Sequence, residues 1–219
     1  MEKKGIPFRQ IHLDFHTSPL IGDIGAEFDA EEFADTLKKA HVNSINLFTK
    51  CHHGMFYYPT AIGTMHPGLT FDLFGAQMQA CREHEIRALA YTCVSWNEDW
   101  AARHPEWLMV NAEGIWGNKK PFDSSYYSWK CICYNNKDYQ EILKAEMKEV
   151  YDRYHPDGFW IDIVQGRGCV CTTCSGDMKA LGLDPENATD VRRFDKISET
   201  RFCEEFYRYL KSLDGDREI

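Results

Sequence analysis

The sequence predicts an α/β protein of the (β/α)8 TIM-barrel type, to which this chain contributes about the first four strand–helix units. Short apolar runs alternate with longer segments of helical periodicity, an order that implies a parallel sheet with right-handed crossovers. A complete barrel typically needs about 250 residues, and four units already use the 219 residues present here. We therefore expect one partial barrel domain over residues 1–219, with a self-pairing half-barrel or a small open sheet as the alternatives.

Four strands and five helices are expected along the chain. The strands are predicted at residues 10–17, 42–51, 87–94 and 157–164, and the helices at residues 29–41, 71–85, 137–154, 177–181 and 189–213. Asp29 is predicted to cap its helix, because a carboxylate follows three residues later at Glu32. The long connection at residues 95–136 contains five tryptophans: Trp96, Trp100, Trp107, Trp116 and Trp129. A connection of that length is usually functional or contains small elements of its own.

The fourth predicted strand carries the leading catalytic candidate, Asp162. The run Asp157-Gly158-Phe159-Trp160-Ile161-Asp162-Ile163-Val164 is otherwise apolar, and a carboxylate buried there costs roughly several kcal/mol unless it is paired or hydrogen-bonded. Strand alternation places Trp160 and Asp162 on one face and the aliphatic side chains on the other. Because Asp162 lies near the carboxyl end of the strand, where α/β proteins place their chemistry, we expect it to be functional rather than a loop anchor.

Polar and aromatic residues also follow the other three predicted strands. The candidates for substrate binding are Asp14, His16, His52, His53, Tyr57, Trp96, Glu98 and Trp160. In a parallel sheet these strand ends lie at one rim, and aromatic rings together with carboxylates and hydrogen-bonding groups suit a sugar. Glycoside cleavage needs two carboxyl groups, one as nucleophile or base and one as acid. The alternative interpretation is that such residues cap helices or satisfy one another within loops.

The first strand also allows a second kind of enzyme. His12, Asp14 and His16 share one side of a straight strand, which is a metal-binding pattern. His12 and His16 would however lie about 13 Å apart at about 3.3 Å per residue, too far to bind one ion. A metal-dependent hydrolase that uses His12, Asp14 and His16 is therefore kept as a lower-ranked alternative.

Three cysteines stand close together after the fourth strand, at Cys169, Cys171 and Cys174. Zinc takes four soft ligands in a tetrahedron, and closely spaced cysteines on a turn can provide them with little strain. The fourth ligand could be Cys93, Cys131 or Cys133. Four thiolates leave no open coordination position, so we expect a structural Zn²⁺; the alternative is a set of free thiols.

Composition restricts the partners. The net charge is −9 and no block of Lys or Arg stands out, which argues against a nucleic-acid partner. The N-terminus lacks an apolar signal segment, and no apolar run is long enough to cross a bilayer, so no membrane partner is expected. Nine cysteines without an export signal favour reduced thiols or a metal site and a cytoplasmic protein.

Two segments resemble alpha-L-fucosidases of glycoside hydrolase family 29. Lys50-Cys51-His52-His53-Gly54-Met55-Phe56 is similar to their Lys-His-His-Asp-Gly-Phe segment, with the Asp absent, and Asp157 to Asp162 resembles their fourth strand. That resemblance implies that Asp162 is the nucleophile and that His52 and His53 contact substrate. Together with the opening strand, these segments most resemble the hypothetical glycosyl hydrolase 6 group, and residues 104–107 with 111–114 resemble a segment of related barrel hydrolases.

The cysteine loop instead resembles the zinc cluster of family 42 beta-galactosidases. In that family a fourth Cys stands six residues before a Tyr that opens a helix, and Cys133 has this relation to Tyr139. The resemblance therefore implies zinc ligation by Cys133, Cys169, Cys171 and Cys174.

These observations predict a retaining, fucosidase-like glycoside hydrolase that acts on a carbohydrate. Asp162 attacks the sugar, His16, His52 and His53 bind its hydroxyls, and Trp96 and Tyr57 stack on it. The acid partner is expected from the second half of the barrel, so a homo-oligomer or a C-terminal half would complete the enzyme. The rival from another class is a non-catalytic carbohydrate-binding or assembly module.

Overall fold

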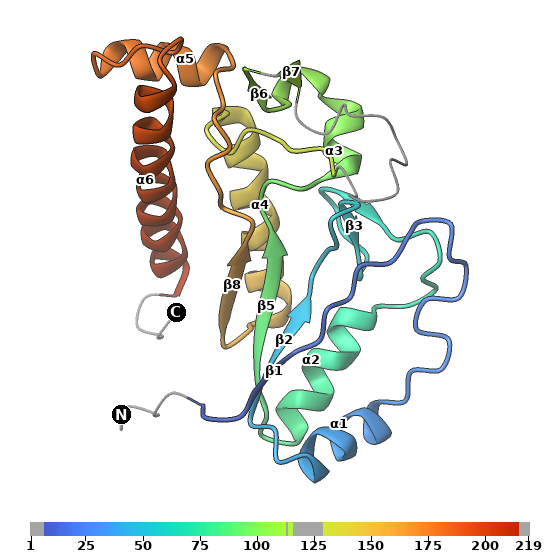
Figure 1. The fold of residues 1–219 in the computed structure, drawn as a ribbon. Helices are drawn as coiled ribbons and strands as arrows, with labels where there is room; N and C mark the ends of the chain where they lie inside the picture. Colours follow the sequence, from blue (N-terminus) through green and yellow to red (C-terminus); the bar gives the residue numbers. More distant parts are fainter. Residues whose placement is uncertain (1–6, 113, 116–128, 215–219) are drawn as a thin grey trace.

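The computed structural model describes residues 7–112, 114–115 and 129–214, and Figure 1 shows them as a parallel sheet with helices along its flanks. Trp116 and residue 113 of the 111–114 segment lie outside the described residues. The elements, in chain order, are β1 (Gln10–His12), α1 (Ala30–Lys39), β2 (Ser44–Phe48), β3 (Met55–Phe56), β4 (Thr64–Met65), α2 (Leu73–Glu83), β5 (Arg87–Cys93), α3 (Glu98–Arg103), a 3-10 helix (Pro105–Trp107), β6 (Val110–Asn111), β7 (Gly114–Ile115), α4 (Lys137–Tyr154), β8 (Gly158–Asp162), α5 (Thr172–Ala180) and α6 (Ala188–Asp214).

The main sheet has the order β1-β2-β5-β8, and every neighbouring pair is parallel. Each strand therefore lies beside the next one in the chain, with α1, α2 and α4 in the crossovers, as in consecutive units of a (β/α)8 barrel. The predicted α/β class and the partial barrel are confirmed. The small pairs β3–β4 and β6–β7 belong to the loops that follow β2 and β5.

Two predicted boundaries are wrong for identifiable reasons. β1 ends at His12 rather than at residue 17, because the hydroxyl of Tyr57 donates to the carbonyl of Phe15 and receives the N–H of Thr17, which holds this segment away from the ladder. The short helix predicted at 177–181 is α5, which begins at Thr172. It starts that early because the first helical bond, from the Ser175 N–H to the Cys171 carbonyl, lies inside the cysteine loop.

Short polar side chains begin the helices. Asp29 accepts from the N–H of Glu32 at 2.8 Å and thereby caps α1 as predicted. Asp72, Asn97 and Asn136 make the equivalent bond to the third residue after each of them. A cap of this kind satisfies one of the backbone donors left open in the first helical turn.

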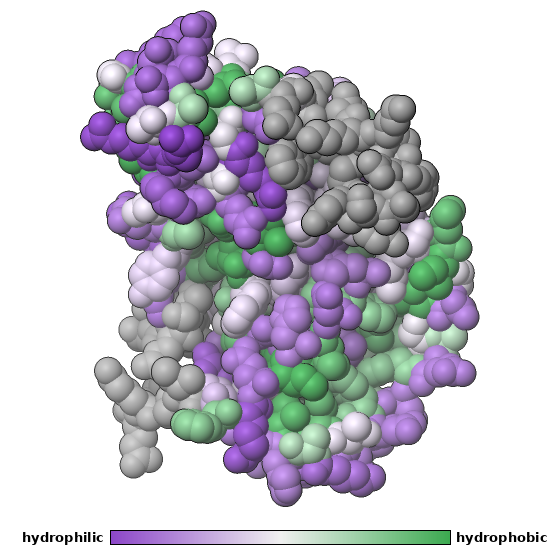
Figure 2. Space-filling view, viewed as in Figure 1, coloured by the Kyte–Doolittle hydropathy of each residue, from purple (hydrophilic) through white to green (hydrophobic). Residues whose placement is uncertain are grey.

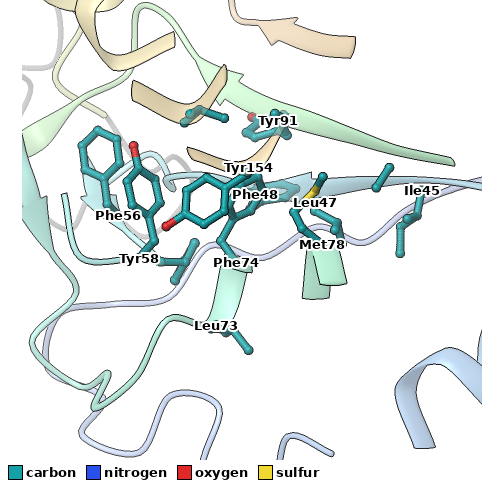
Figure 3. Close-up of a cluster of buried hydrophobic side chains, with 14 of the residues drawn as sticks. Ile45, Leu47, Phe48, Phe56, Tyr58, Leu73, Phe74, Met78, Tyr91 and Tyr154 are labelled. Atoms are coloured by element: carbon teal, nitrogen blue, oxygen red, sulfur yellow. The ribbon is translucent and has the colours of Figure 1, made fainter. Parts of the chain in front are cut away.

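The apolar interior forms two clusters. One lies between the sheet and α2, and Figure 3 shows its aromatic part, where Phe56, Tyr58 and Phe74 gather beside Tyr154. The other packs α4 and α6 around the cysteine loop. Phe159 on β8 is packed against both clusters, so the strand that carries Asp162 joins the two halves of the interior.

A buried ion pair connects the segment that follows β2 to α4. Nζ of Lys50 lies 2.5 Å from Oε2 of Glu146, and both side chains are almost completely buried. The indole N–H of Trp100 donates to the other carboxylate oxygen at 3.0 Å. The carboxylate is thus paired and hydrogen-bonded, which is the condition under which two buried charges are tolerated.

Glu146→Gln is expected to destabilise the fold by about 3–5 kcal/mol, because it leaves the Lys50 ammonium buried without a counter-charge. Asp152→Asn is the matched control, since it removes an exposed pair on the same helix, Lys148–Asp152 at 2.6 Å, worth about 0–1 kcal/mol. Urea unfolding of the two variants measures the difference. Equal losses of free energy would show that burial of the Lys50–Glu146 pair carries no extra cost.

The surface in Figure 2 is hydrophilic over α5, with apolar atoms visible over the region of α2. No helix in the described part of the chain combines the length and the apolar character needed to cross a bilayer.

Candidate active site and cysteine cluster

Asp162 ends β8 on the face that carries Trp160. In the β5–β8 register Tyr91 is paired with Trp160 and Cys93 with Asp162, and in-register residues of parallel strands point to the same face. Phe159 packs into the interior from the opposite face. Trp160 is 44% exposed, so this face of β8 is open to a ligand.

The carboxylate of Asp162 is held by a tyrosine that sequence reasoning did not select. The hydroxyl of Tyr91 donates to Oδ2 of Asp162 at 2.7 Å. The Tyr91 ring is completely buried and stacks on Phe48, with centroids 3.8 Å apart. Burial raises the pKa of Tyr91, and Cys93 and the contact with Asp162 raise it further, so the hydroxyl keeps its proton and remains a donor.

His52 contacts the hydroxyl of this tyrosine. Its Nε2 lies 3.1 Å from the Tyr91 hydroxyl. Since the hydroxyl gives its proton to Asp162, it must accept one from Nε2–H of His52. Burial, followed by the neighbouring His16 and His53, lowers the pKa of His52 to about 3. The imidazole is therefore neutral at ordinary pH, and its Nδ1 is an acceptor.

His16 supports His52 from the first strand–helix loop. The two rings lie 3.6 Å apart, and Nδ1 of His16 accepts the backbone N–H of His52 at 3.2 Å. Nε2 of His16 lies 2.8 Å from Oδ1 of Asp14. Burial lowers the pKa of His16, while Asp14 and Asp162 oppose that shift. Both ring nitrogens are occupied by the chain, so the expected bond from His16 to a sugar hydroxyl does not fit this arrangement.

Two tryptophans, Trp96 and Trp129, lie beside His52 and His53. The ring of His53 lies 4.5 Å from that of Trp129, and the ring of His52 lies 4.7 Å from that of Trp96. The guanidinium of Arg167 covers the Trp96 ring at 5.4 Å. The indole Nε1 of Trp96 is buried and has no hydrogen-bond partner among the described residues. A buried donor in this state calls for a water or a ligand acceptor.

Tyr57 and Glu98 hold loops in place. Tyr57 is 1% exposed and its hydroxyl is bound to the first loop, so this position excludes the predicted stacking on a sugar. Oε1 of Glu98 accepts from the N–H of Lys130 at 2.6 Å. Burial raises the pKa of Glu98, although the Lys130 N–H opposes the shift. Glu98 thus connects the start of α3 to the segment before α4.

The alternative metal face on the first strand is not assembled. Nδ1 of His12 lies 3.0 Å from the side-chain amide of Asn46, and His16 is bound to Asp14. Over residues 7–112, 114–115 and 129–214, the only group that brings three or more ligand atoms together is the cysteine cluster. The metal-dependent hydrolase is therefore not supported by the geometry.

The cysteine cluster consists of Cys133, Cys169, Cys171 and Cys174. All four Sγ atoms lie within 4.8 Å of one another. Sγ of Cys133 lies 3.5 Å from that of Cys174 and 3.7 Å from that of Cys171. Four thiolates around a tetrahedral zinc, with Zn–S about 2.3 Å, would be about 3.8 Å apart. The cluster could hold a metal ion, with the fourth cysteine being Cys133 rather than Cys131 or Cys93.

The surroundings of the cluster suit thiolates. The side-chain amide of Asn135 donates to Sγ of Cys174 at 3.3 Å. Contact with Cys133 lowers the pKa of Cys171, whereas contact with Cys169 raises the pKa of Cys133. Thiols this close cannot all be deprotonated, because the thiolates repel one another. A bound cation would stabilise all four thiolates.

A clamped loop joins Asp162 to the cluster. The N–H of Gly166 donates to Glu199 at 2.6 Å, and the N–H of Gly168 donates to Asp195 at 3.0 Å. A Cβ at Gly166 would lie 2.2 Å from the Cβ of Asp195, so the backbone approaches α6 more closely than a larger residue allows. The loop is thus fixed by α6 on one side and by Cys169 on the other.

Residues 29–163, more than half of the chain, match the family described as hypothetical glycosyl hydrolase 6. The chain belongs to this family. Among solved structures it is similar to alpha-L-fucosidase isoenzyme 2 from Paenibacillus thiaminolyticus, with 37% identity, a TM-score of 0.84, and coverage of 94% of this chain and 31% of that one. The chain therefore spans about a third of that fucosidase. Curated proteins gave no match.

A more distant similarity concerns the fold alone. The glycoside hydrolase domain of PgaB (BpsB) from Bordetella bronchiseptica is 13% identical, with a TM-score of 0.71, over 98% of this chain and 64% of that one. This likeness extends the barrel relationship to the region of α5 and α6, beyond the residues that match the family.

Proposed function

We propose that this chain carries the nucleophile half of a retaining glycoside hydrolase that acts on α-L-fucoside-like substrates, with Asp162 as the nucleophile. One observation supports this most: the carboxylate of Asp162 ends a barrel strand beside Trp160, fixed by Tyr91 and bordered by His52. Membership of a glycosyl hydrolase family and the 37% identity to a fucosidase point in the same direction.

In the proposed reaction, Asp162 attacks the anomeric carbon and forms a covalent glycosyl–enzyme. His52 accepts a sugar hydroxyl through Nδ1, the indole N–H of Trp96 donates to the substrate, and Trp160 packs against the ring. A second carboxyl group about 5–5.5 Å from the first must protonate the leaving group and then activate water. We propose that this acid comes from the remaining barrel or from a second copy of the chain.

The remaining barrel, or a second copy of the chain, could pack beside β8. A groove of about 450 Å³ between β8 and α6 is lined mostly by apolar residues, including Phe159, Ile161 and Phe202, and Asp162 also borders it. Within the described residues β8 is an edge of the sheet. A fifth parallel strand pairing with β8 would cover both the groove and the edge.

We further propose that the cysteine cluster binds a structural Zn²⁺. Cys133, Cys169, Cys171 and Cys174 would hold it, and the ion would supply a rigid cross-link between the segment before α4 and the loop after β8. Four thiolates leave no position for substrate, so the metal would take no part in the reaction.

Trapping tests the proposed function. Incubation with 2-deoxy-2-fluoro-α-L-fucosyl fluoride is expected to add one fluorofucosyl group to the protein, because the 2-fluorine slows both formation and release of the covalent intermediate, while the activated fluoride leaving group speeds its formation alone. Peptide mass spectrometry should place the group on Asp162. Labelling of another carboxylate would assign the role of nucleophile to that residue instead of Asp162. Binding of fucosides without any label or turnover would favour the non-catalytic module.

A further inference from the structure

A series of hydrogen bonds that links three strand ends leads to one oxygen of Asp162. Nε2–H of His52 donates to the Tyr91 hydroxyl at 3.1 Å, which donates to Oδ2 of Asp162 at 2.7 Å. The backbone of His52 is tied in turn to His16, which is bound to Asp14. Each donor and acceptor along this series has a fixed direction, because the Tyr91 proton can serve only one acceptor at a time.

We propose that Tyr91 is the positioning residue of Asp162, and that His52 holds the Tyr91 hydroxyl with its proton directed at the carboxylate. This inference rests on the proposed function of Asp162. Tyr91 acts through Asp162 and not on the sugar, since its side chain is completely buried.

Packing makes the arrangement rigid. The Tyr91 ring is stacked on Phe48 with centroids 3.8 Å apart, and the His12 ring lies beside this stack, 5.4 Å from each of the two centroids. A ring that is stacked on one side and completely buried has little freedom to rotate, so its hydroxyl fixes Oδ2 of Asp162 and leaves the second oxygen to face the substrate. Positioning of this kind keeps the attacking atom near the reactive geometry.

Tyr91→Phe tests the role against a close control. Tyr154 also donates its hydroxyl to a carboxylate at 2.7 Å, that of Asp72, and is also buried. In the full-length enzyme, Tyr91→Phe is expected to lower kcat on an aryl fucoside roughly 10–100-fold, the size of one bond to a charged group. KM should change little, because the lost bond does not touch substrate.

Tyr154→Phe and Tyr91→Phe are expected to lower the melting temperature by similar amounts, because each removes one hydroxyl–carboxylate bond. Tyr154→Phe is expected to leave kcat unchanged. If both variants kept the wild-type kcat, or if Tyr91→Phe raised KM alone, the positioning role would be overturned.

Carbon-13 NMR gives a readout that does not depend on turnover. The carboxyl resonance of Asp162, assigned from its absence in Asp162→Asn, is expected to shift in Tyr91→Phe and to stay in place in Tyr154→Phe. An unmoved resonance would overturn the role of Tyr91. A shifted resonance together with retained turnover in Asp162→Asn would instead remove the nucleophile assignment alone.

The contribution of His52 is tested by rescue. Glutamine can place an amide N–H near the position of Nε2, and leucine cannot. Because His52 also binds substrate in the proposed reaction, the readout is the carboxyl resonance of Asp162, which is expected to shift in His52→Leu and to return toward its wild-type position in His52→Gln. The same resonance position in the two His52 variants would overturn the support of Tyr91 by this imidazole.

Discussion

Asp162→Asn is expected to lower the turnover of an aryl α-L-fucoside by roughly 10⁴-fold or more, the scale seen when one member of a catalytic group is removed. An amide is a very weak nucleophile, so the covalent intermediate no longer forms at a useful rate. The amide oxygen can still accept the Tyr91 hydroxyl, which donates to Oδ2 at 2.7 Å, and the fold should therefore persist. Initial-rate kinetics with the full-length enzyme and a melting curve measure the two effects.

Azide distinguishes loss of the nucleophile from a general weakening of the site. Asp162→Gly leaves a space beside the anomeric carbon, and azide entering it should restore turnover and yield a fucosyl azide of inverted configuration, because one displacement replaces two. The same anion should not restore Tyr91→Phe, in which the carboxylate remains. Turnover by Asp162→Asn within about tenfold of wild type would contradict the assignment.

Much of the scaffold that presents Asp162 could be predicted from the order of apolar runs. The helix expected at residues 137–154 is α4 without any change of bounds. Alternation along the fourth strand correctly separates Trp160 and Asp162 from Phe159. These features depend on local periodicity and on the rule that parallel strands need crossovers, so a single sequence contains them.

Tyr91 escaped prediction because its role depends on register. On its own strand it is one more residue of a buried run. Only the pairing of Tyr91 with Trp160 and of Cys93 with Asp162 brings its hydroxyl to the carboxylate. Which residue of one parallel strand stands opposite which residue of the next is set by packing across the whole sheet and is not written in either strand. The strand-end position, two residues before Cys93, was the available signal.

The stacking on a sugar that is predicted for Tyr57 does not fit the structure, for a related reason. An aromatic residue in a strand-end loop suits a sugar platform, but this loop folds back so that the Tyr57 hydroxyl ties down residues 15–17. His16 was likewise expected at the substrate, and its ring is instead committed to Asp14 and to the backbone of His52. Contacts between loops decide both cases, and such contacts leave no periodic trace in the sequence.

The cysteine cluster carries the second large expected effect. Cys174→Ser is expected to lose one zinc per chain and to destabilise the fold by about 3–5 kcal/mol, in the range of variants that lose a metal site, or roughly 6–20 °C in melting temperature for a domain of this size. Metal analysis of the purified protein and thermal unfolding measure both quantities.

Cys131→Ser is the matched control, because Cys131 is equally buried, lies two residues from Cys133, and stands outside the cluster. That variant should keep its zinc. Zinc retained by Cys174→Ser, or lost by Cys131→Ser, would contradict the ligand set.

Loss of the metal should weaken the site without changing its chemistry. The loop between Asp162 and Cys169 would keep its bonds to α6, from Gly166 to Glu199 and from Gly168 to Asp195, but would lose its anchor at the cysteine end. Cys174→Ser is therefore expected to retain measurable turnover with an unchanged product configuration, whereas Asp162→Asn retains almost none. A zinc-free enzyme as inactive as Asp162→Asn, yet still folded, would place the metal in the reaction itself and would overturn its structural assignment.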